Sequence, residues 1–274
     1  MTRTIVPASP DPFAAVAPAA GGPPAAVVGV FGATGGLGVS CLAVALAVRL
    51  THALSGEVAL VDADPSGGGL DLLLGCEHEP GLRWSALAGV SGTVDGAGLV
   101  AQLPRAHGVA VLSHEVLDPL AAAQAPTADQ LGAVVRGLAT GASAVVVGGS
   151  RWPGPPGLVD HLDESVLLVG SGVHQLAAAA GLAVHASLPG FSGEPPGLVL
   201  RTAGRNAAAP ERVAEHLDLP LLGTLGEDRG LDADLTNGLP PGHRARGALS
   251  STATQVIDAL ALGPARRRRA GGRR

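Results

Sequence analysis

A glycine-rich turn is the part of this chain whose residue types and spacing point most directly to chemistry. Residues 32–41 read Gly-Ala-Thr-Gly-Gly-Leu-Gly-Val-Ser-Cys, between an apolar run at 26–31 and a longer one that extends to residue 50. A turn of this kind between a strand and a helix directs backbone N–H groups and the positive end of the helix at an anion. The turn therefore predicts a phosphate-binding site.

Two residue types that phosphate-using enzymes often need are missing from the whole chain. All 18 Lys and Arg positions among the 274 residues are arginine, and there is no tyrosine. These absences exclude a P-loop lysine, a Schiff-base lysine and a tyrosine–lysine proton-transfer pair. Codon bias in a GC-rich genome is the alternative explanation for much of the excess of Ala, Gly and Arg.

One interpretation of the turn is a dinucleotide site. Gly32, Gly35 and Gly38 form a G-x-x-G-x-x-G pattern that resembles the short-chain dehydrogenase/reductases. Asp62 ends the next apolar run, where a carboxylate could bind ribose hydroxyls. That resemblance implies a Tyr-x-x-x-Lys catalytic pair, which this chain cannot supply. Only a non-catalytic NAD(P)-binding protein fits this interpretation.

The second interpretation is a P-loop. The register from Ala33 to Cys41 resembles the deviant Walker A motif of the MinD/ParA family, G-K-G-G-x-G-K-T-T, with matches at Gly35, Gly36, Gly38 and Ser40. The resemblance implies that ATP and Mg²⁺ bind here and that the Ser40 hydroxyl is the Mg²⁺ ligand. The predicted nucleotide-binding residues are Gly35, Gly36, Leu37, Gly38, Val39, Ser40, Cys41 and Asp62.

Three further segments carry the resemblance along the chain. Residues 61–75 are similar to the MinD/ParA segment after the second strand, in which Asp64 matches the carboxylate that orients the attacking water. Residues 219–228 (LPLLGTLGED) and 235–241 (LTNGLPP) resemble that family's closing strand and the loop after it. Residues 67–84 resemble the CpaE-like group of high-GC bacteria, so the likeness spans about 26–262.

This chain departs from the motif mainly at the positions where the family has charged residues. Thr34 stands in place of the lysine that reaches across a dimer, and Val39 in place of the lysine that contacts phosphate. Ala33 replaces the first glycine, and the apolar run at 144–147 continues into Gly-Gly-Ser instead of the Walker B aspartate. Single electrostatic donors contribute about 3–4 kcal/mol to a transition state, so we expect a degenerate, non-hydrolysing site.

Some alternatives stay open for the arginines that could replace the missing lysines and for the aspartates that remain near the turn. Arg83 and Arg151 are the candidate cations, although neither lies on the turn. Backbone amides and Ser40 could still hold a nucleotide weakly, and the alternative is a glycine-rich turn kept only for close packing. Asp64 is a residual catalytic candidate, and Asp71 is expected in the first turn of a helix.

The resemblance implies a cellular role beyond nucleotide binding. A CpaE-like protein would act as a localisation or scaffold factor in tight-adherence pilus and secretion assembly or in septum-site placement. Its implied partner is the hexameric secretion ATPase of the pilus system. Loss of the lysine at Thr34 argues against ATP-driven dimerisation and leaves a constitutive homodimer open. The rival hypothesis is an active or weak ATPase of the MinD/ParA type.

The elements that must position these residues alternate along the chain. Short apolar runs predict strands at 26–31, 57–61, 109–112, 144–147, 166–169, 198–200 and 221–225. Longer Ala- and Leu-rich segments predict helices at 38–50, 128–138, 173–184, 210–217 and 248–262. Continuous apolar strands separated by helices indicate an α/β fold with a doubly wound, mostly parallel sheet covered on both faces.

Charge and proline content predict three segments. Residues 1–25 are a Pro- and Ala-rich leader expected to be disordered, 26–262 the P-loop domain, and 263–274 a basic tail with six arginines. The net charge is −5, so the chain before the tail is acidic and no sequence-specific nucleic-acid binding is expected. The tail is a candidate for contact with anionic membrane, and the alternative is a solubilising end.

Cysteine and histidine usage adds little further chemistry. Cys41 and Cys76 lie in apolar runs and are expected to be small buried residues in a reducing compartment. The nine histidines show no metal-binding spacing, and no run of about 18 apolar residues appears. Trp84 and Trp152 are expected in the core. We expect a cytoplasmic protein, with peripheral contact at the inner face of the membrane as an option.

Overall fold

The computed structural model describes residues 25–114, 125–186, 194–202 and 209–263. Its eight-stranded sheet has the order β3-β4-β2-β5-β1-β6-β7-β8, and every pair is parallel except β3 with β4. The strands are β1 Ala26–Gly32, β2 Val58–Asp62, β3 Arg105–Ala106, β4 Val109–Leu112, β5 Ala144–Arg151, β6 Glu164–Gly170, β7 Gly197–Arg201 and β8 Leu221–Leu225. This confirms the predicted doubly wound, mostly parallel sheet.

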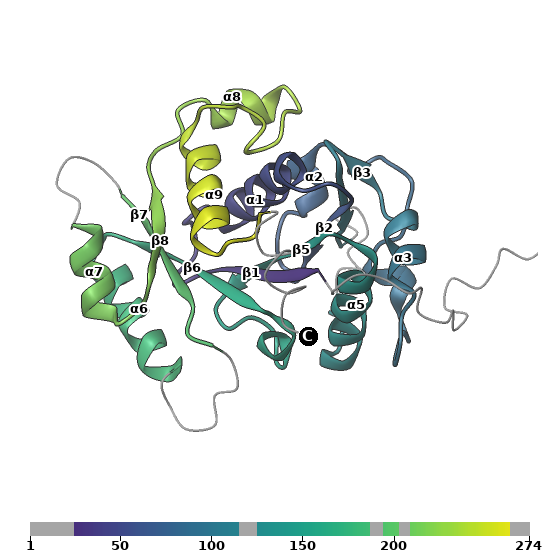
Figure 1. Cartoon of the computed structure of the whole chain (residues 1–274), viewed down its shortest axis with the longest axis horizontal. Coiled ribbons are helices and arrows are strands. Elements are labelled where there is room, and N and C mark those ends of the chain that lie inside the picture. The colour runs from purple at the N-terminus through teal and green to yellow at the C-terminus, as the bar shows by residue number, and fades with distance from the viewer. Residues whose placement is uncertain (1–24, 115–124, 187–193, 203–208, 264–274) are drawn as a thin grey trace, which may run out of the picture.

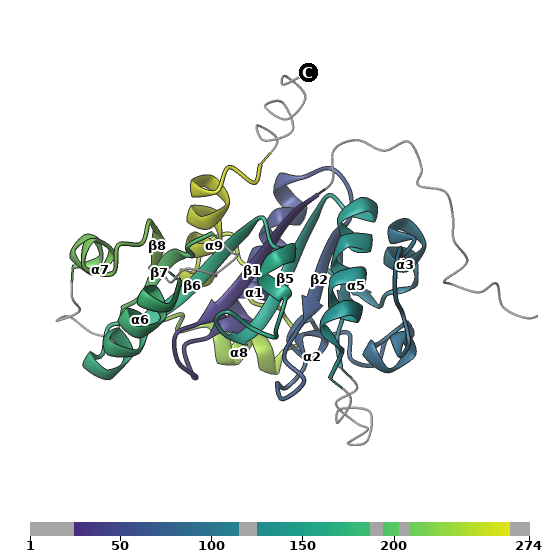
Figure 2. The same cartoon turned by 90° about the horizontal axis from the view of Figure 1, so that it is seen from below.

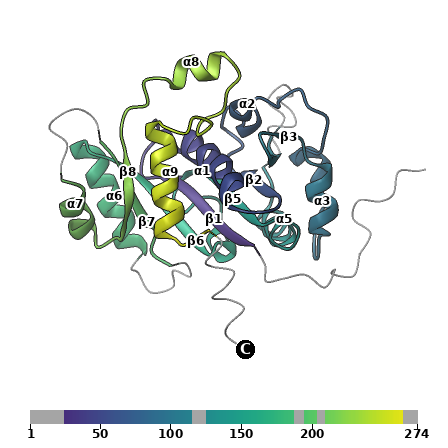
Figure 3. The ribbon, with the colours of Figure 1, turned by 45° about the horizontal axis from the view of Figure 1, so that its top comes forward.

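Helices cover both faces of the sheet (Figure 1). On one side are α1 Val39–Ala53, α2 Leu70–Leu74, α8 Leu231–Thr236 and α9 Ala248–Ala259, and Figure 3 brings α1 and α9 forward. On the other side are α3 Gly96–Gln102, α5 Ala128–Gly141, α6 Val173–Ala186 and α7 Pro210–Leu217, which Figure 2 views from below. Short 3₁₀ turns η1 and η2 occupy Trp84–Leu87 and Leu158–His161.

The core is built from small and branched apolar residues, as the composition predicts. The strands β2 and β4 are buried along their whole length, because helices lie on both of their faces. In α1, Ala43, Ala45 and Ala47 are all fully buried. Helices α3 and α5 approach so closely that a methyl group on Gly96 would lie 1.9 Å from the carbonyl oxygen of Gly137. Both Trp84 and Trp152 are buried.

The differences from the predicted elements concern short segments. The strands and helices of the prediction are present with ends shifted by a few residues, and α5 begins at a capping box between Thr127 and Gln130. The prediction missed α3, α8 and the two-residue strand β3. These elements have seven residues or fewer, too few to show a helical or alternating apolar period.

The predicted leader and tail fall almost entirely outside the described residues. Only Ala25 of the leader and Gly263 of the tail are described, so both segments remain predictions. Within the described part of the chain, no helix is long and apolar enough to cross a membrane.

Candidate nucleotide-binding site

The predicted turn lies at the carboxyl end of β1, where parallel α/β sheets usually bind ligands. Gly36 and Gly38 have φ values of 74° and 89°, a left-handed backbone that glycine adopts without strain. Ala33 N donates to Leu168 O at 2.9 Å, which ties the start of the turn to β6. Gly35 and Gly36 form a hydrogen-bonded turn, and the N–H groups of Gly38, Val39 and Ser40 after it have no partner within the described residues. The turn therefore offers a run of free donors at the N-terminus of α1.

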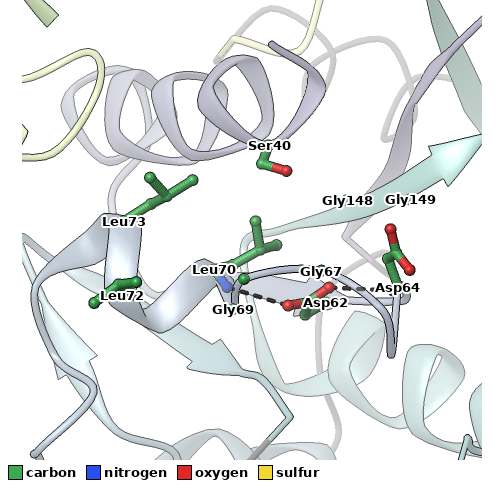
Figure 4. A pocket seen from close by; sticks show the side chains of 11 residues that line it. Ser40, Asp62, Asp64, Gly67, Gly69, Leu70, Leu72, Leu73, Gly148 and Gly149 are labelled. Atoms are coloured by element: carbon green, nitrogen blue, oxygen red, sulfur yellow. Dashed lines mark hydrogen bonds between the residues drawn. The ribbon is translucent and has the colours of Figure 1, made fainter. Parts of the chain in front are cut away.

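Two cavities flank the first turn of α1. The aspartate cavity, of about 140 Å³, is lined by Ser40, Asp62, Asp64, the Gly67–Gly69 loop, α2 and the end of β5 (Figure 4). The arginine cavity, of about 200 Å³, is lined by Gly38, Cys41, Arg201 and residues of the β8–α8 loop. Ser40 and Cys41 are neighbours in the helix, so they face different cavities.

Asp62 is the most constrained acid in the aspartate cavity. Only 3% of it is exposed, and its carboxylate accepts bonds from Asp64 N and Leu70 N, each at 3.1 Å, and from Ser113 Oγ at 3.3 Å. Burial raises the pKa of Asp62 to about 6, although these donors act in the opposite direction. The carboxylate holds the 63–70 loop in place, and its role as a nucleotide ligand stays a prediction.

Asp64 and Ser40 lie at the accessible side of the same cavity. Asp64 Oδ1 accepts from Ser66 N at 3.0 Å, and Figure 4 draws its carboxylate at the edge of the group, near Gly148 and Gly149. Ser40 is exposed and projects from α1 into the space between these glycines and Leu70. The two side chains are placed where a cation beside a phosphate would need oxygen ligands. Their predicted roles in Mg²⁺ binding and catalysis stay predictions.

The end of β5 is closely packed around its two glycines. In the parallel pairing, Gly148 lies opposite Asp62. A methyl group on Gly148 would lie 2.8 Å from Leu70 Cδ1 and 3.4 Å from Ala43 Cβ. One on Gly149 would lie 2.4 Å from a ring carbon of Phe31. Leu70 and Phe31 thus fill the space on either face of the strand, and an aspartate there would have to displace them.

Neither arginine proposed from the sequence serves the turn. Arg83 Nε donates to Asp71 Oδ2 at 3.1 Å, and both side chains are nearly buried, with 11% and 4% exposed. This pair fixes α2 to the segment after it. Arg151 is exposed at the end of β5, opposite Gly32 in the pairing with β1. Asp71 lies in the first turn of α2, as expected, and is buried.

Arg201, which the sequence analysis missed, reaches the turn from the end of β7. Its Nη1 donates to Leu37 O at 2.5 Å, and a methyl group on Gly38 would lie 2.8 Å from the same nitrogen. Burial raises the pKa of the nearby Cys41 thiol, and the positive charge of Arg201 lowers it by a smaller amount. Arg201 follows Leu37 by 164 residues, so no local motif could have revealed it.

The cysteines and histidines add no second site. Cys76 is buried, as predicted, whereas Cys41 is only half-buried because it faces the arginine cavity. Both are free thiols. No cluster of three or more metal-ligating side chains occurs among the described residues.

Comparisons with known proteins agree with this architecture. No protein-family model matches the chain. It is 35% identical over 243 residues to an uncharacterized protein of Mycobacterium tuberculosis, found in two strains. The match covers 86% of this chain and 64% of the relative, so the chain spans less than two thirds of that relative's length.

Solved structures extend the comparison to proteins of known activity. A ParA family ATPase from Chlorobium tepidum matches with a TM-score of 0.72 and 18% identity, over 86% of this chain and 98% of that one. The septum site-determining protein MinD from Pyrococcus horikoshii, complexed with Mg-ADP, matches with a TM-score of 0.64 and 18% identity, over 86% and 97%. The chain therefore has the P-loop fold of the MinD/ParA ATPases.

Proposed function

We propose that this chain is a degenerate, non-hydrolysing member of the MinD/CpaE-like P-loop proteins that works as a localisation or scaffold factor. The observation that carries the proposal is the end of β5. A methyl group on Gly148 would already lie 2.8 Å from Leu70, so the position that would carry the Walker B carboxylate is filled by a packed apolar side chain. The packing around this position suits glycine, which supports the proposed loss of the acid.

The turn still suits a weakly bound phosphate chain. Its free backbone donors and the N-terminus of α1 favour an anion. Val39 and Thr34 contribute no positive charge, however, and single donors of this kind contribute about 3–4 kcal/mol to transition-state stabilisation. Binding without turnover is the outcome that this combination favours. ATP or ADP with Mg²⁺ is the ligand we propose, held by the turn and by Ser40.

The cellular role rests on the sequence resemblance. Residues 67–84 resemble CpaE-like proteins, which supports a place in tight-adherence pilus or secretion assembly, with septum-site placement as the second option. The proposed partner is the hexameric secretion ATPase of the pilus system. A constitutive homodimer is compatible with this role, because Thr34 cannot form the lysine bridge of an ATP-dependent one.

Phosphate release in the presence of Mg-ATP tests the proposal. The full chain and an Asp64→Ala variant are incubated with Mg-ATP, and inorganic phosphate is measured over time. We expect the same background release from both, since Asp64 lacks the lysine and acid that would act with it. Turnover by the wild-type chain that disappears in Asp64→Ala would establish an active ATPase and remove the proposal.

Peripheral membrane contact is tested separately. We propose that the arginines at 266–274 attract anionic lipid, because clustered basic residues contribute about 1 kcal/mol each near such a surface. Vesicles containing phosphatidylserine are sedimented with the full chain and with a chain that ends at residue 265. Binding that is equal for both chains would dismiss the membrane role and leave the scaffold proposal standing.

A further inference from the structure

We propose that Arg201 has taken over the cationic role of the missing loop lysines, and that it binds the first phosphate of a nucleotide. A site with its only cation at that end would hold AMP, ADP and ATP with similar affinity, so it could not act as an ATP/ADP switch. The inference rests on the proposed nucleotide site and adds to it the residue that binds the phosphate and the class of ligand.

Arg201 is an unused cation. Arg83, Arg105 and Arg244 each pair with a carboxylate, at Asp71, Glu57 and Asp234. Among the described residues, Arg201 forms no ion pair within 4 Å, and its side chain donates one hydrogen bond, from Nη1 to Leu37 O. A half-buried guanidinium has five donors, so the remaining four are available to a ligand.

The position of Arg201 determines which part of a ligand it can meet. It lies beside Gly38 and Cys41, on the side of α1 that faces the arginine cavity. Free backbone amides of the turn lie next to Arg201. A phosphate there would accept hydrogen bonds from these amides and charge-assisted hydrogen bonds from the guanidinium. Among the described residues, Arg201 is the only arginine that lines either cavity, and Glu227, Asp228 and Asp232 line the same cavity as Arg201.

The far side of the turn repels additional negative charge. The aspartate cavity contains Asp62 and Asp64 and no basic residue. A phosphate chain that crosses the turn from Arg201 toward Ser40 would bring its second and third phosphates toward these carboxylates. In the absence of a lysine and of Mg²⁺ to offset that repulsion, added phosphates gain little binding energy. The charge distribution therefore favours similar affinities for nucleotides with one, two or three phosphates.

The rest of the arginine cavity suits a nucleoside better than a bare anion. Leu225, Leu231 and Leu249 provide apolar surface, and Glu227 and Asp232 provide acceptors for hydroxyl or amino groups. Inorganic phosphate would contact Arg201 and the turn, but it would gain nothing from the apolar surface to offset repulsion by these acids. The ligand class is therefore a nucleoside 5′-phosphate.

Calorimetric titration of the full chain with AMP, ADP, ATP and inorganic phosphate, each with and without Mg²⁺, tests the inference. Without Mg²⁺, we expect the three nucleotides to bind within about threefold of one another and phosphate to bind far more weakly. Arg201→Gln should weaken AMP binding by about tenfold to a hundredfold, the range of a lost charge-assisted bond. Arg201→Lys keeps the charge and should retain more affinity than Arg201→Gln. Arg212→Ala, at an exposed arginine of α7 that lines neither cavity, is the matched control and should bind as wild type.

Several results would overturn the inference. One is ATP binding more than tenfold tighter than AMP, and another is absence of binding by all three nucleotides. Equal affinity in Arg201→Gln and Arg201→Lys would mean that the side chain only supports the loop, and urea unfolding of each variant verifies that it is folded. The outcome is separate from that of the proposed function: ATP turnover with an intact Arg201 effect would refute the non-hydrolysing proposal alone.

Discussion

The two cavities beside α1 use their charges in opposite ways. In the aspartate cavity, Asp62 is buried and satisfied by backbone and hydroxyl donors, and behind it Asp71 is paired with Arg83. In the arginine cavity, Arg201 has no carboxylate partner among the described residues, and Glu227 and Asp232 are exposed. The carboxylates on the first side are engaged by contacts within the fold, whereas the charges on the second side remain available for a ligand.

Under the proposed function, this difference explains how a nucleotide fold could lose turnover and keep its architecture. The acid that survives at the end of β2 is retained by packing, since Trp84 Nε1 also donates to the carbonyl oxygen of Asp62 at 2.7 Å. The acid that would follow β5 is gone, and Leu70 occupies its space. Substitutions on the aspartate side should therefore change stability, and substitutions on the arginine side should change affinity.

The largest expected effect is on the buried ion pair. Arg83→Ala leaves the Asp71 carboxylate buried without its partner, and breaking such a pair costs about 3–5 kcal/mol. Arg83 also donates to the carbonyl oxygens of Cys76, Glu77 and Glu79, which would lose those contacts. Urea unfolding followed by circular dichroism measures the change. A loss below 1 kcal/mol would mean that this side of the turn is not held by its charges.

The next effect is on the pH dependence of stability. Burial raises the pKa of Asp62 from 3.8 to about 6, so the folded chain holds this proton more tightly than the unfolded chain. Stability should therefore fall as pH rises from about 4 to about 6, by roughly 3 kcal/mol. Asp62→Asn removes the titrating group. Urea midpoints between pH 4 and pH 7.5 should then lose this slope, and an unchanged slope would assign it to other groups.

A smaller effect is expected at Trp84. Trp84→Phe keeps the buried ring and removes the donor to Asp62 O, which should cost about 1–2 kcal/mol. Nucleotide affinity should stay within twofold of wild type. A stability loss together with a tenfold loss of affinity would contradict the separation of the two sides.

The smallest stability effect should be at Arg201. The side chain is half-buried and its bond to Leu37 O is its only contact of this kind among the described residues, so Arg201→Gln should destabilise the chain by less than about 1 kcal/mol. The same urea titration measures it. A loss near that of Arg83→Ala would make Arg201 a structural residue.

The sequence allowed the fold to be predicted, because apolar strands and longer apolar helices alternate clearly. It also located the turn and the missing acid after β5, since both follow directly from residue type and order. It could not place Arg201 beside Leu37, because only the parallel arrangement of β1, β6 and β7 brings them together. It also gave no sign that Asp62 is held by Leu70 N and Ser113, which depends on how the 63–70 loop folds back.

The central claim, a nucleotide fold without a nucleotide switch, is tested most directly by the assembly state. Sedimentation velocity of the full chain is measured at the same protein concentration without nucleotide, with Mg-ADP and with Mg-ATP. The charge distribution predicts one sedimentation coefficient in all three conditions, whether that of a monomer or of a constitutive dimer. A dimer that forms with Mg-ATP and dissociates with Mg-ADP would contradict the account.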